Sequence, residues 1–362
     1  MAGLRRRNMY FEELDEKISP PDLAAAAQAQ AQWLDRAIPI GSLGLLEQAV
    51  IRIAGMTGTC DVQIKKRAVI VMCADNGVVA EGVTQCGSEI TAIVAGNIAR
   101  GNSSVCRMAS VAHAEVFPVD IGMINPVNTA GLLDRRVAAG TGNIVVGPAM
   151  TQGQAIQAIE VGIDLVRHLK EQGYSMLATG EMGIGNTTTS SAVAAVLLGR
   201  PVREVTGRGA GLSDTGLERK IKVIEQAIAC NEPDPGNALD VLQKLGGFDI
   251  AGMTGVFIGG AIYRIPVLID GFISAMSALL AIRLCPSCAP YMMASHVSAE
   301  PAGIMALDAL GLTPVITAGM RLGEGTGAVC AWPLLDMALA IYNDMSSFSE
   351  IGIEAYTPQG GK

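Results

Sequence analysis

The richest chemistry in this chain lies in a glycine-rich segment that carries one carboxylate and ends in a run of hydroxyl side chains. Residues 180–191 read GEMGIGNTTTSS, and the apolar residues 192–198 that follow predict a helix. Peptide N–H groups at a helix N-terminus point toward an anion, and hydroxyl groups in the first turn add donors. Glycine also lets the backbone approach a ligand closely. The pattern therefore indicates a phosphate site, with an ordinary strand–turn–helix capped by Asn186 or Thr187 as the alternative.

A second glycine-rich segment lies beside a predicted helix that carries several cations. Residues 207–214 read GRGAGLSD, and Arg219, Lys220 and Lys222 follow within two turns. Lys220 could reach a phosphate as a point charge. The alternative is a solvated basic helix face, which is what most such charge runs form.

A third glycine-rich segment contains a single acid. Residues 321–328 read RLGEGTGA, which places Glu324 in a flexible turn just before an apolar helix over 328–341. A carboxylate in a partly dry crevice has its pKa raised by desolvation and can serve as a general base. An acid on an exposed surface turn is the alternative.

Other catalytic and binding patterns are weaker. No Lys-Ser/Thr pair follows the glycines of 180–191, so the segment is not a P-loop, and the third glycine of GxGxxG is missing. A nicotinamide-dependent oxidoreductase is therefore a poor hypothesis. The eight cysteines are scattered, and the Cys285/Cys288 pair has no second pair at metal-ligand spacing. We expect buried free thiols, no metal and no cofactor. His113 and His168 are expected to be structural, and His296 is expected near the site.

The elements that position these segments read as an α/β fold. Short apolar runs end in glycine or a polar residue and alternate with helical stretches, which predicts a mostly parallel sheet with helices on both faces. The predicted strands are 68–73, 114–119, 175–179, 267–269 and 291–294. Ligands bind at the carboxyl ends of such strands. This rule predicts one crevice whose rim carries Asp75, Asp120, Glu181, Asp270 and His296.

Helical segments at both ends of the chain predict a smaller helical domain. Pro20-Pro21-Asp22 begins an Ala/Gln-rich helix toward Arg36, and Gly41-Ser42 begins another through Ile53. We expect residues 1–60 and 326–362 to form this small domain. Residues 61–325 would then form the α/β catalytic domain.

Bulk composition excludes several classes of protein. The chain has 362 residues, half of them apolar, and a net charge of −8 without a basic stripe, so nucleic acid is not an expected partner. The apolar stretch 250–269 is interrupted by Arg264 and Pro266, and 272–282 is too short to span a bilayer. We expect both to be core elements of a soluble cytoplasmic protein.

Taken together, the segments resemble the nicotinate-nucleotide:dimethylbenzimidazole phosphoribosyltransferases of cobamide assembly. The matching stretches run in order from roughly residue 30 to 345: 41–44, 80–83, 142–150, 180–192, 246–256, 266–274, 295–300 and 320–328. The resemblance implies transfer of ribose 5-phosphate from nicotinate mononucleotide to a lower-ligand base, with release of nicotinate. It also implies a Rossmann-like sheet with a small helical domain, working as a homodimer.

The resemblance also implies residue roles. Glu324 falls on the family's general base, and Glu181 falls on a second acid of the same site. Phosphate and ribose contacts carry over to Gly183, Thr187, Gly209 and Lys220. Further substrate contacts are expected at Asn186, Thr188, Asp270 and Ser298.

The chain departs from the family around the acceptor pocket. Asn76 stands where relatives commonly have histidine, and Thr84–Ser88 match poorly, so Asn76 and Thr84 are expected to help choose the acceptor. 5,6-Dimethylbenzimidazole or a related base is the expected acceptor, with adenine, phenol or p-cresol as alternatives. A heterodimer with a related chain is the alternative assembly. A non-catalytic partner subunit is opposed by the retention of Glu181 and Glu324.

Overall fold

One twisted parallel sheet organises the molecule. The structure is a computed structural model that describes residues 10–357, so the outermost residues of the two predicted helical ends, 1–9 and 358–362, lie outside the described residues. Six strands pair in the order β3-β2-β1-β4-β5-β6, all parallel. They are β1 (Arg67–Ala74), β2 (Glu115–Gly122), β3 (Leu133–Asp134), β4 (Met176–Met182), β5 (Val267–Ile269) and β6 (Met292–Ala294). The order reverses between β1 and β4, which is where ligands bind in doubly wound sheets.

All five predicted strands are present, and two of them are longer than predicted. A sixth strand was not predicted. The second and third strands were predicted to end at Val119 and Thr179, whereas β2 continues to Gly122 and β4 to Met182. Glu181 therefore belongs to a strand, since it pairs with Met72 of β1. The missed strand, β3, is a two-residue edge strand beside β2 and carries no apolar run to reveal it.

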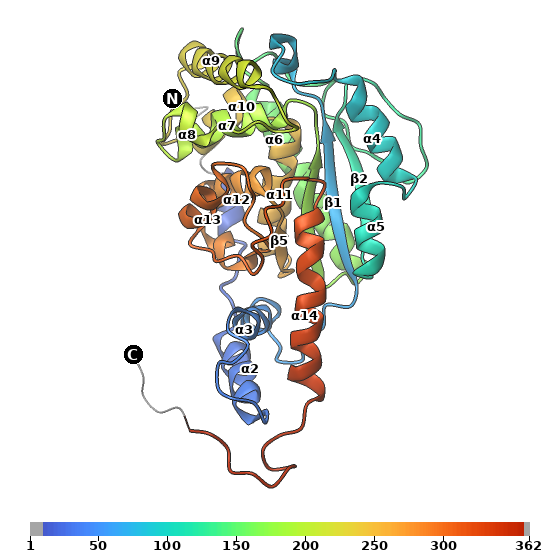
Figure 1. Cartoon of the computed structure of the whole chain (residues 1–362), viewed down its shortest axis with the longest axis vertical. Helices are drawn as coiled ribbons and strands as arrows, with labels where there is room; N and C mark the ends of the chain where they lie inside the picture. Colours follow the sequence, from blue (N-terminus) through green and yellow to red (C-terminus); the bar gives the residue numbers. More distant parts are fainter. Residues whose placement is uncertain (1–9, 358–362) are drawn as a thin grey trace.

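Helices cover both faces of the sheet, as predicted (Figure 1). α6 (Gln152–Glu171) and α11 (Phe248–Ile262) lie on one face, while α4 (Glu89–Ala99), α5 (Ser104–Val111) and α14 (Thr326–Asp344) lie on the other. α6 and α11 are in backbone contact, because a Cβ at Gly255 would lie only 1.9 Å from the Ile159 carbonyl oxygen. The glycine-rich composition of 246–260 thus serves close helix packing.

The remaining elements surround the carboxyl ends of the strands. They are the helices α7 (Asn186–Leu197), α8 (Val202–Val205), α9 (Asp214–Asn231), α10 (Ala238–Leu245), α12 (Phe272–Leu284) and α13 (Gly303–Leu310), and the 3₁₀ turn η1 (Gly77–Glu81). The 3₁₀ turn η2 (Pro286–Tyr291) lies at the amino end of β6, which it directly precedes. The two long apolar stretches are core helices, since α11 is buried from Phe248 to Ala261 and α12 from Phe272 to Ala281. Across residues 10–357, no helix combines the length and the hydrophobicity needed to cross a membrane.

Two N-terminal helices pack beside the C-terminal half of α14 (Figure 1). α2 (Leu23–Asp35) is capped by Asp22, which accepts hydrogen bonds from the N–H groups of Ala24 and Ala25, and α3 (Leu45–Thr57) packs between α2 and α14. The chain from Tyr10 to Ser19 lies elsewhere: the Tyr291 hydroxyl in η2 donates to the Ser19 carbonyl. The division into domains at residues 60 and 325 stays a prediction.

The cysteines are free thiols, but they are not all buried. Cys285 and Cys288 lie in the core, and burial raises the pKa of the Cys285 thiol to about 12, which makes it a poor nucleophile. Cys86 and Cys230 are exposed, so the prediction of buried thiols is wrong for these two. Both lie at loop or helix-end positions, where no core is available to cover them.

Candidate functional site

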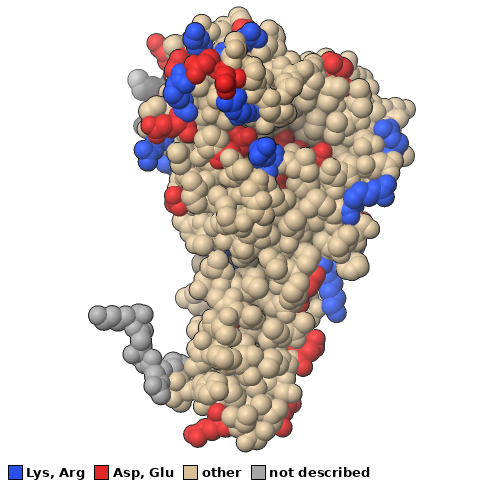
Figure 2. All heavy atoms as spheres, in the orientation of Figure 1, with Lys and Arg blue, Asp and Glu red and all other residues tan. Residues whose placement is uncertain are grey.

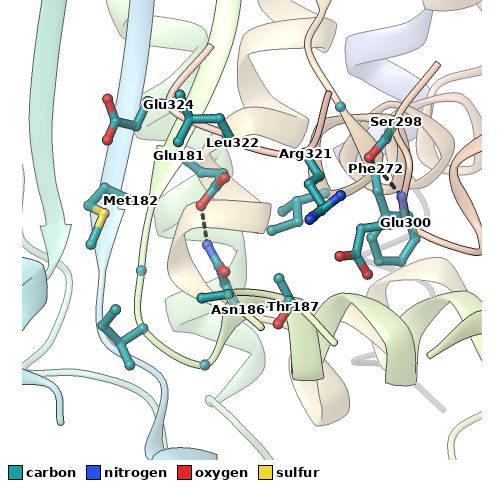
Figure 3. Close-up of a pocket in the computed structure, with 18 of the residues that line it drawn as sticks. Glu181, Met182, Asn186, Thr187, Phe272, Ser298, Glu300, Arg321, Leu322 and Glu324 are labelled. Atoms are coloured by element: carbon teal, nitrogen blue, oxygen red, sulfur yellow. Dashed lines mark hydrogen bonds between the residues drawn. The ribbon is translucent and has the colours of Figure 1, made fainter. Parts of the chain in front are cut away.

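A pocket with a volume of about 260 Å³ opens at the carboxyl ends of β4, β5 and β6 (Figure 3). All three glycine-rich segments reach it, although they lie far apart in the sequence. Its walls come from residues within 83–86, 181–187, 208–212, 270–274, 296–300 and 321–324. The strand-end rule therefore located the crevice correctly.

Most of the predicted site residues line this pocket. The lining includes Thr84, Glu181, Gly183, Asn186, Thr187, Gly209, Asp270, Ser298 and Glu324, together with His296. Asn76, Thr188 and Lys220 do not line it, because their side chains are buried. The Asn76 amide donates to the Ile184 carbonyl at 3.3 Å and thus supports the wall from behind. The structure gives Asn76 and Thr188 no direct route to a substrate.

Two acids that were predicted on the rim of the crevice bind other parts of the protein instead. Asp75 is buried and accepts a hydrogen bond from the Ile124 N–H at 2.8 Å. Asp120 lies within β2 and forms an ion pair of 2.7 Å with Arg136. Neither lines the pocket, so their expected place on its rim is wrong. Both follow the rule for strand ends but lie on the β1–β2 side of the sheet, which other loops cover.

Glu181 belongs to a buried network of two carboxylates that share one amide. The Asn186 side-chain nitrogen donates to a Glu181 carboxylate oxygen (Figure 3). It also donates, at 3.1 Å, to Asp249 of α11. Burial, then the neighbouring charge of Asp249, raises the pKa of Glu181 well above its ordinary value. Burial also raises the pKa of Asp249 to about 6. Two adjacent charges that are shielded from solvent repel, so protonation of one carboxylate is easier in this pair than in an exposed one.

The turn that carries Glu324 is held in an unusual backbone conformation. Gly323, Glu324 and Gly325 all have positive φ, at 86°, 62° and 93°. Only glycine adopts this region freely, so Glu324 stores strain on the order of 1 kcal/mol. Gly180 of β4 lies directly against the turn, since a Cβ there would meet the Glu324 carbonyl oxygen at 2.4 Å. The glycines on both sides bring the Glu181 strand and the Glu324 turn into contact.

The Glu324 carboxylate lies half-buried beside the start of α5. One oxygen accepts a hydrogen bond from the Val105 N–H at 3.3 Å. Burial raises the pKa of Glu324, while the bonds from Val105 and Ser103 lower it. A raised pKa suits a general base, because such a carboxylate is a stronger proton acceptor than an exposed one.

Asp270 fixes the same turn from the other side. Its carboxylate accepts hydrogen bonds from the N–H groups of Gly325, Gly327 and Ala328 at 3.2, 2.7 and 3.0 Å. These are the first peptide groups of α14, so Asp270 satisfies the N-terminus of this helix. Burial raises the pKa of Asp270, and the nearby His296 opposes the rise. Asp270 therefore acts first as an anchor of the Glu324 turn.

The start of α7 and the buried Lys220 form the anion side of the pocket. Gly185 caps α7 with a φ of 93° and without a side-chain bond, so the capping by Asn186 or Thr187 that the alternative required does not occur. Lys220 is 1% exposed, and its Nζ donates to the Thr187 hydroxyl at 2.8 Å and to the Gly207 carbonyl at 3.1 Å. Burial lowers the pKa of Lys220 to about 8. The alternative of a solvated basic face is wrong for this lysine.

Sequence reasoning missed several residues of the pocket. Gln85 ties two walls together, since its amide donates to the carbonyls of Ala210 and Gly211 at 2.9 and 2.7 Å. Glu300 lines the pocket, and one of its oxygens is buried without a hydrogen-bond partner among residues 10–357. Arg321 also lines it. The signals were the SHVSAE stretch for Glu300, the RLGEG stretch for Arg321 and the departing stretch Thr84–Ser88 for Gln85, and none of them specifies side-chain direction.

Metal ligation has no support at this site. Among residues 10–357, no group of three or more His, Cys, Asp or Glu side chains is arranged to hold a metal ion.

Acidic side chains are visible inside the hollow of the face in Figure 2, with basic side chains at its edge. The lining acids are Glu181, Asp270, Glu300 and Glu324.

Comparison with known proteins defines the class and then the family. A sequence profile of phosphoribosyltransferases matches residues 18–353. The chain is 46% identical over 350 residues, 97% of its length, to the nicotinate-nucleotide–dimethylbenzimidazole phosphoribosyltransferase of Ruminiclostridium cellulolyticum, of which it covers 99%. It is 48% identical over 321 residues to the enzyme of the same name from Acetivibrio thermocellus, covering 89% of this chain and 92% of that one.

The fold comparison agrees with the sequence comparison. The crystal structure of CobT from Thermus thermophilus superposes with a TM-score of 0.87 at 37% identity, covering 92% of this chain and all of that one. The chain belongs to the nicotinate-nucleotide–dimethylbenzimidazole phosphoribosyltransferase family.

Proposed function

We propose that this chain transfers ribose 5-phosphate from nicotinate mononucleotide to 5,6-dimethylbenzimidazole, giving an α-riboside 5-phosphate and nicotinate. The observation that carries the proposal is the meeting, in one pocket, of the α7 start with two acids, Glu181 and Glu324. The printed names of the relatives support the same reaction.

The chemistry asks for charge stabilisation and one proton transfer. The bond from the anomeric carbon to the pyridinium nitrogen breaks, and its electron pair goes to nicotinate. A nitrogen of the acceptor forms the new bond, and the proton on its other ring nitrogen must leave. Glu324 takes this proton as general base, since its half-buried carboxylate has a raised pKa. The other lining acids favour positive charge at the anomeric carbon.

The donor phosphate is held at the anion side. Because the Thr187 hydroxyl already accepts a hydrogen bond from Lys220, its own proton is free to point at a phosphate oxygen. The backbone of Gly183 and Gly209 allows close approach, and Lys220 supplies a positive charge behind the wall. The unpaired oxygen of Glu300 suits a ribose hydroxyl.

The working form proposed for this enzyme is a cytoplasmic homodimer. This expectation comes from the family resemblance, with a heterodimer as the alternative. Light scattering of the purified chain, in the presence and absence of donor, would distinguish a dimer of one chain from a monomer that requires a related partner.

An acceptor panel tests the reaction directly. Nicotinate mononucleotide is incubated with dimethylbenzimidazole, benzimidazole, adenine, phenol or p-cresol, and the products are separated and weighed. We expect dimethylbenzimidazole to give the highest kcat/KM. Preference for adenine or a phenol would contradict the proposed acceptor, and no turnover by the chain alone would contradict the reaction.

The same assay tests the base. Glu324→Gln should keep the fold and lose about 10²–10⁴-fold in kcat, the usual contribution of a general base. Wild-type activity should fall as the pH drops through the raised pKa of Glu324, because the protonated acid cannot accept a proton. The variant should lack this acidic limb, and full activity of Glu324→Gln would rule out the role.

A further inference from the structure

The charges that face the pocket are unevenly matched. Four carboxylates line it, and the cations among its described lining residues are Arg208 and Arg321. Arg208 is already engaged, because its guanidinium donates to the Leu212 carbonyl at 2.9 Å and to Asp214. The Arg321 guanidinium has no hydrogen bond or ion pair with any residue in the range 10–357. Figure 3 shows its side chain between Glu181 and Glu300.

The backbone on both sides of Arg321 is anchored, while its side chain is exposed. The residue before it is fixed, since the Ala299 N–H donates to the Met320 carbonyl at 2.9 Å. The chain after it is fixed as well, because the Gly325 N–H donates to Asp270 at 3.2 Å. The short segment between these two anchors directs Arg321 toward the pocket. An exposed, unpaired cation on an anchored turn at the mouth of an acidic pocket suggests a ligand anion.

The donor presents two anionic groups, and the structure supplies a place for one of them away from Arg321. The phosphate is assigned to the start of α7, where Thr187, Gly209 and Lys220 gather. The carboxylate on the pyridine ring then needs a second cation, because Glu181, Glu300 and the other lining acids would repel it. A guanidinium matches a planar carboxylate with two parallel hydrogen bonds.

We propose that Arg321 binds the ring carboxylate of the nicotinate donor and thereby selects nicotinate mononucleotide over its amide, nicotinamide mononucleotide. The inference rests on the proposed function and specifies how the leaving group is recognised. An amide has no charge and offers one acceptor oxygen, so it would leave the arginine without a charged, bidentate partner. Arg321 touches the leaving group and takes no part in proton transfer.

The test compares two donors in two variants. Arg321→Met should lower kcat/KM for nicotinate mononucleotide by about 10- to 100-fold, the size of a charged hydrogen bond. It should leave kcat/KM for nicotinamide mononucleotide within about threefold of the wild type. Arg321→Lys should retain part of the preference for nicotinate mononucleotide, since lysine keeps the positive charge but cannot form two parallel hydrogen bonds with a carboxylate. Arg208→Met, which removes the other lining arginine, should leave the ratio between the two donors unchanged.

Product binding gives a readout that does not depend on turnover. Arg321→Met should weaken the binding of free nicotinate, measured by calorimetry, while the binding of inorganic phosphate stays the same. Equal losses for both donors, or weaker phosphate binding, would overturn the assignment in favour of a phosphate or structural role. Unchanged nicotinate binding would also overturn it. Wild-type protein that binds nicotinate but turns over no donor would instead count against the proposed function.

Discussion

Adding a single methyl group at Gly180 should impair catalysis specifically, because it would displace the Glu324 turn. A Cβ added here would lie 2.4 Å from the Glu324 carbonyl oxygen, 2.6 Å from its carbonyl carbon and 2.8 Å from the Gly325 nitrogen. Non-bonded heavy atoms reach their best separation at about 3.5 Å. In Gly180→Ala the Glu324 turn must therefore retreat from β4 by about 1 Å.

The expected cost falls mainly on catalysis and much less on folding. Overpacking of this kind destabilises a protein by about 1–3 kcal/mol, which lowers the midpoint of thermal unfolding by only a few degrees in a chain of this size. A displacement of about 1 Å of a reacting group costs about 100-fold in rate. Gly180→Ala should thus be folded but about two orders of magnitude slower in kcat.

The assay is steady-state turnover of nicotinate mononucleotide and dimethylbenzimidazole, with circular dichroism to verify folding. Gly153→Ala in α6 is the matched control, because a Cβ there meets nothing within 4 Å and should leave kcat unchanged. The double variant Gly180→Ala/Glu324→Gln should be little slower than Glu324→Gln alone, since both changes disable one group. A folded Gly180→Ala enzyme with wild-type kcat would refute the idea that this contact places Glu324.

Two further predictions concern buried charges. Because burial raises the pKa of Asp249 to about 6, the folded protein holds this proton more tightly than the unfolded chain, and stability is lost as pH rises from about 4 through 6. The difference in free energy of unfolding between Asp249→Asn and the wild type should therefore shift in favour of the variant by up to about 3 kcal/mol when the pH rises from 4 to 7. Thermal unfolding of both proteins at pH 4 and pH 7 measures this shift, and a difference that does not change with pH would contradict it. Burial lowers the pKa of Lys220 to about 8, so the donor KM should rise as pH increases through 8. Lys220→Met should raise the KM and abolish that dependence, whereas Lys222→Met, an exposed lysine on the same helix, should behave like wild type.

Much of the fold could be predicted because buried parallel strands leave a strong sequence signal. β1 and β5 read as short apolar runs, and turn residues mark their ends. The carboxyl end of β4 did not read as strand, because Gly180 and Glu181 are typical of turns. Only the pairing of these residues with Val71 and Met72 makes them strand, and pairing is a property of the folded sheet.

The residues of the site also differ in how well the sequence predicts them. Glu181 and Glu324 could be predicted because glycines on either side of an acid indicate a close backbone approach. Asp249 could not, since it lies at the start of a buried apolar helix and its importance comes from an amide 63 residues away. Lys220 was predicted as a phosphate contact, but its burial was not, because a helix that also carries Arg219 and Lys222 is typical of an exposed basic face. The orientation of α9, which no local pattern specifies, buries Lys220 and leaves Lys222 exposed.

The distribution of charge in the pocket follows from the donor that it is proposed to bind. Nicotinate mononucleotide carries a positive ring nitrogen between two anionic groups. The acids nearest the centre, Glu181 and Glu324, are partly desolvated and have raised pKa values, so their ionised forms are less favourable there than in water. A bound pyridinium would favour their ionised forms, since an opposite charge within a few ångströms lowers a carboxyl pKa. Lys220 and Arg321 would meet the two anions at the ends. Donor binding would then favour the ionised form of Glu324, which is the form that accepts a proton from the acceptor.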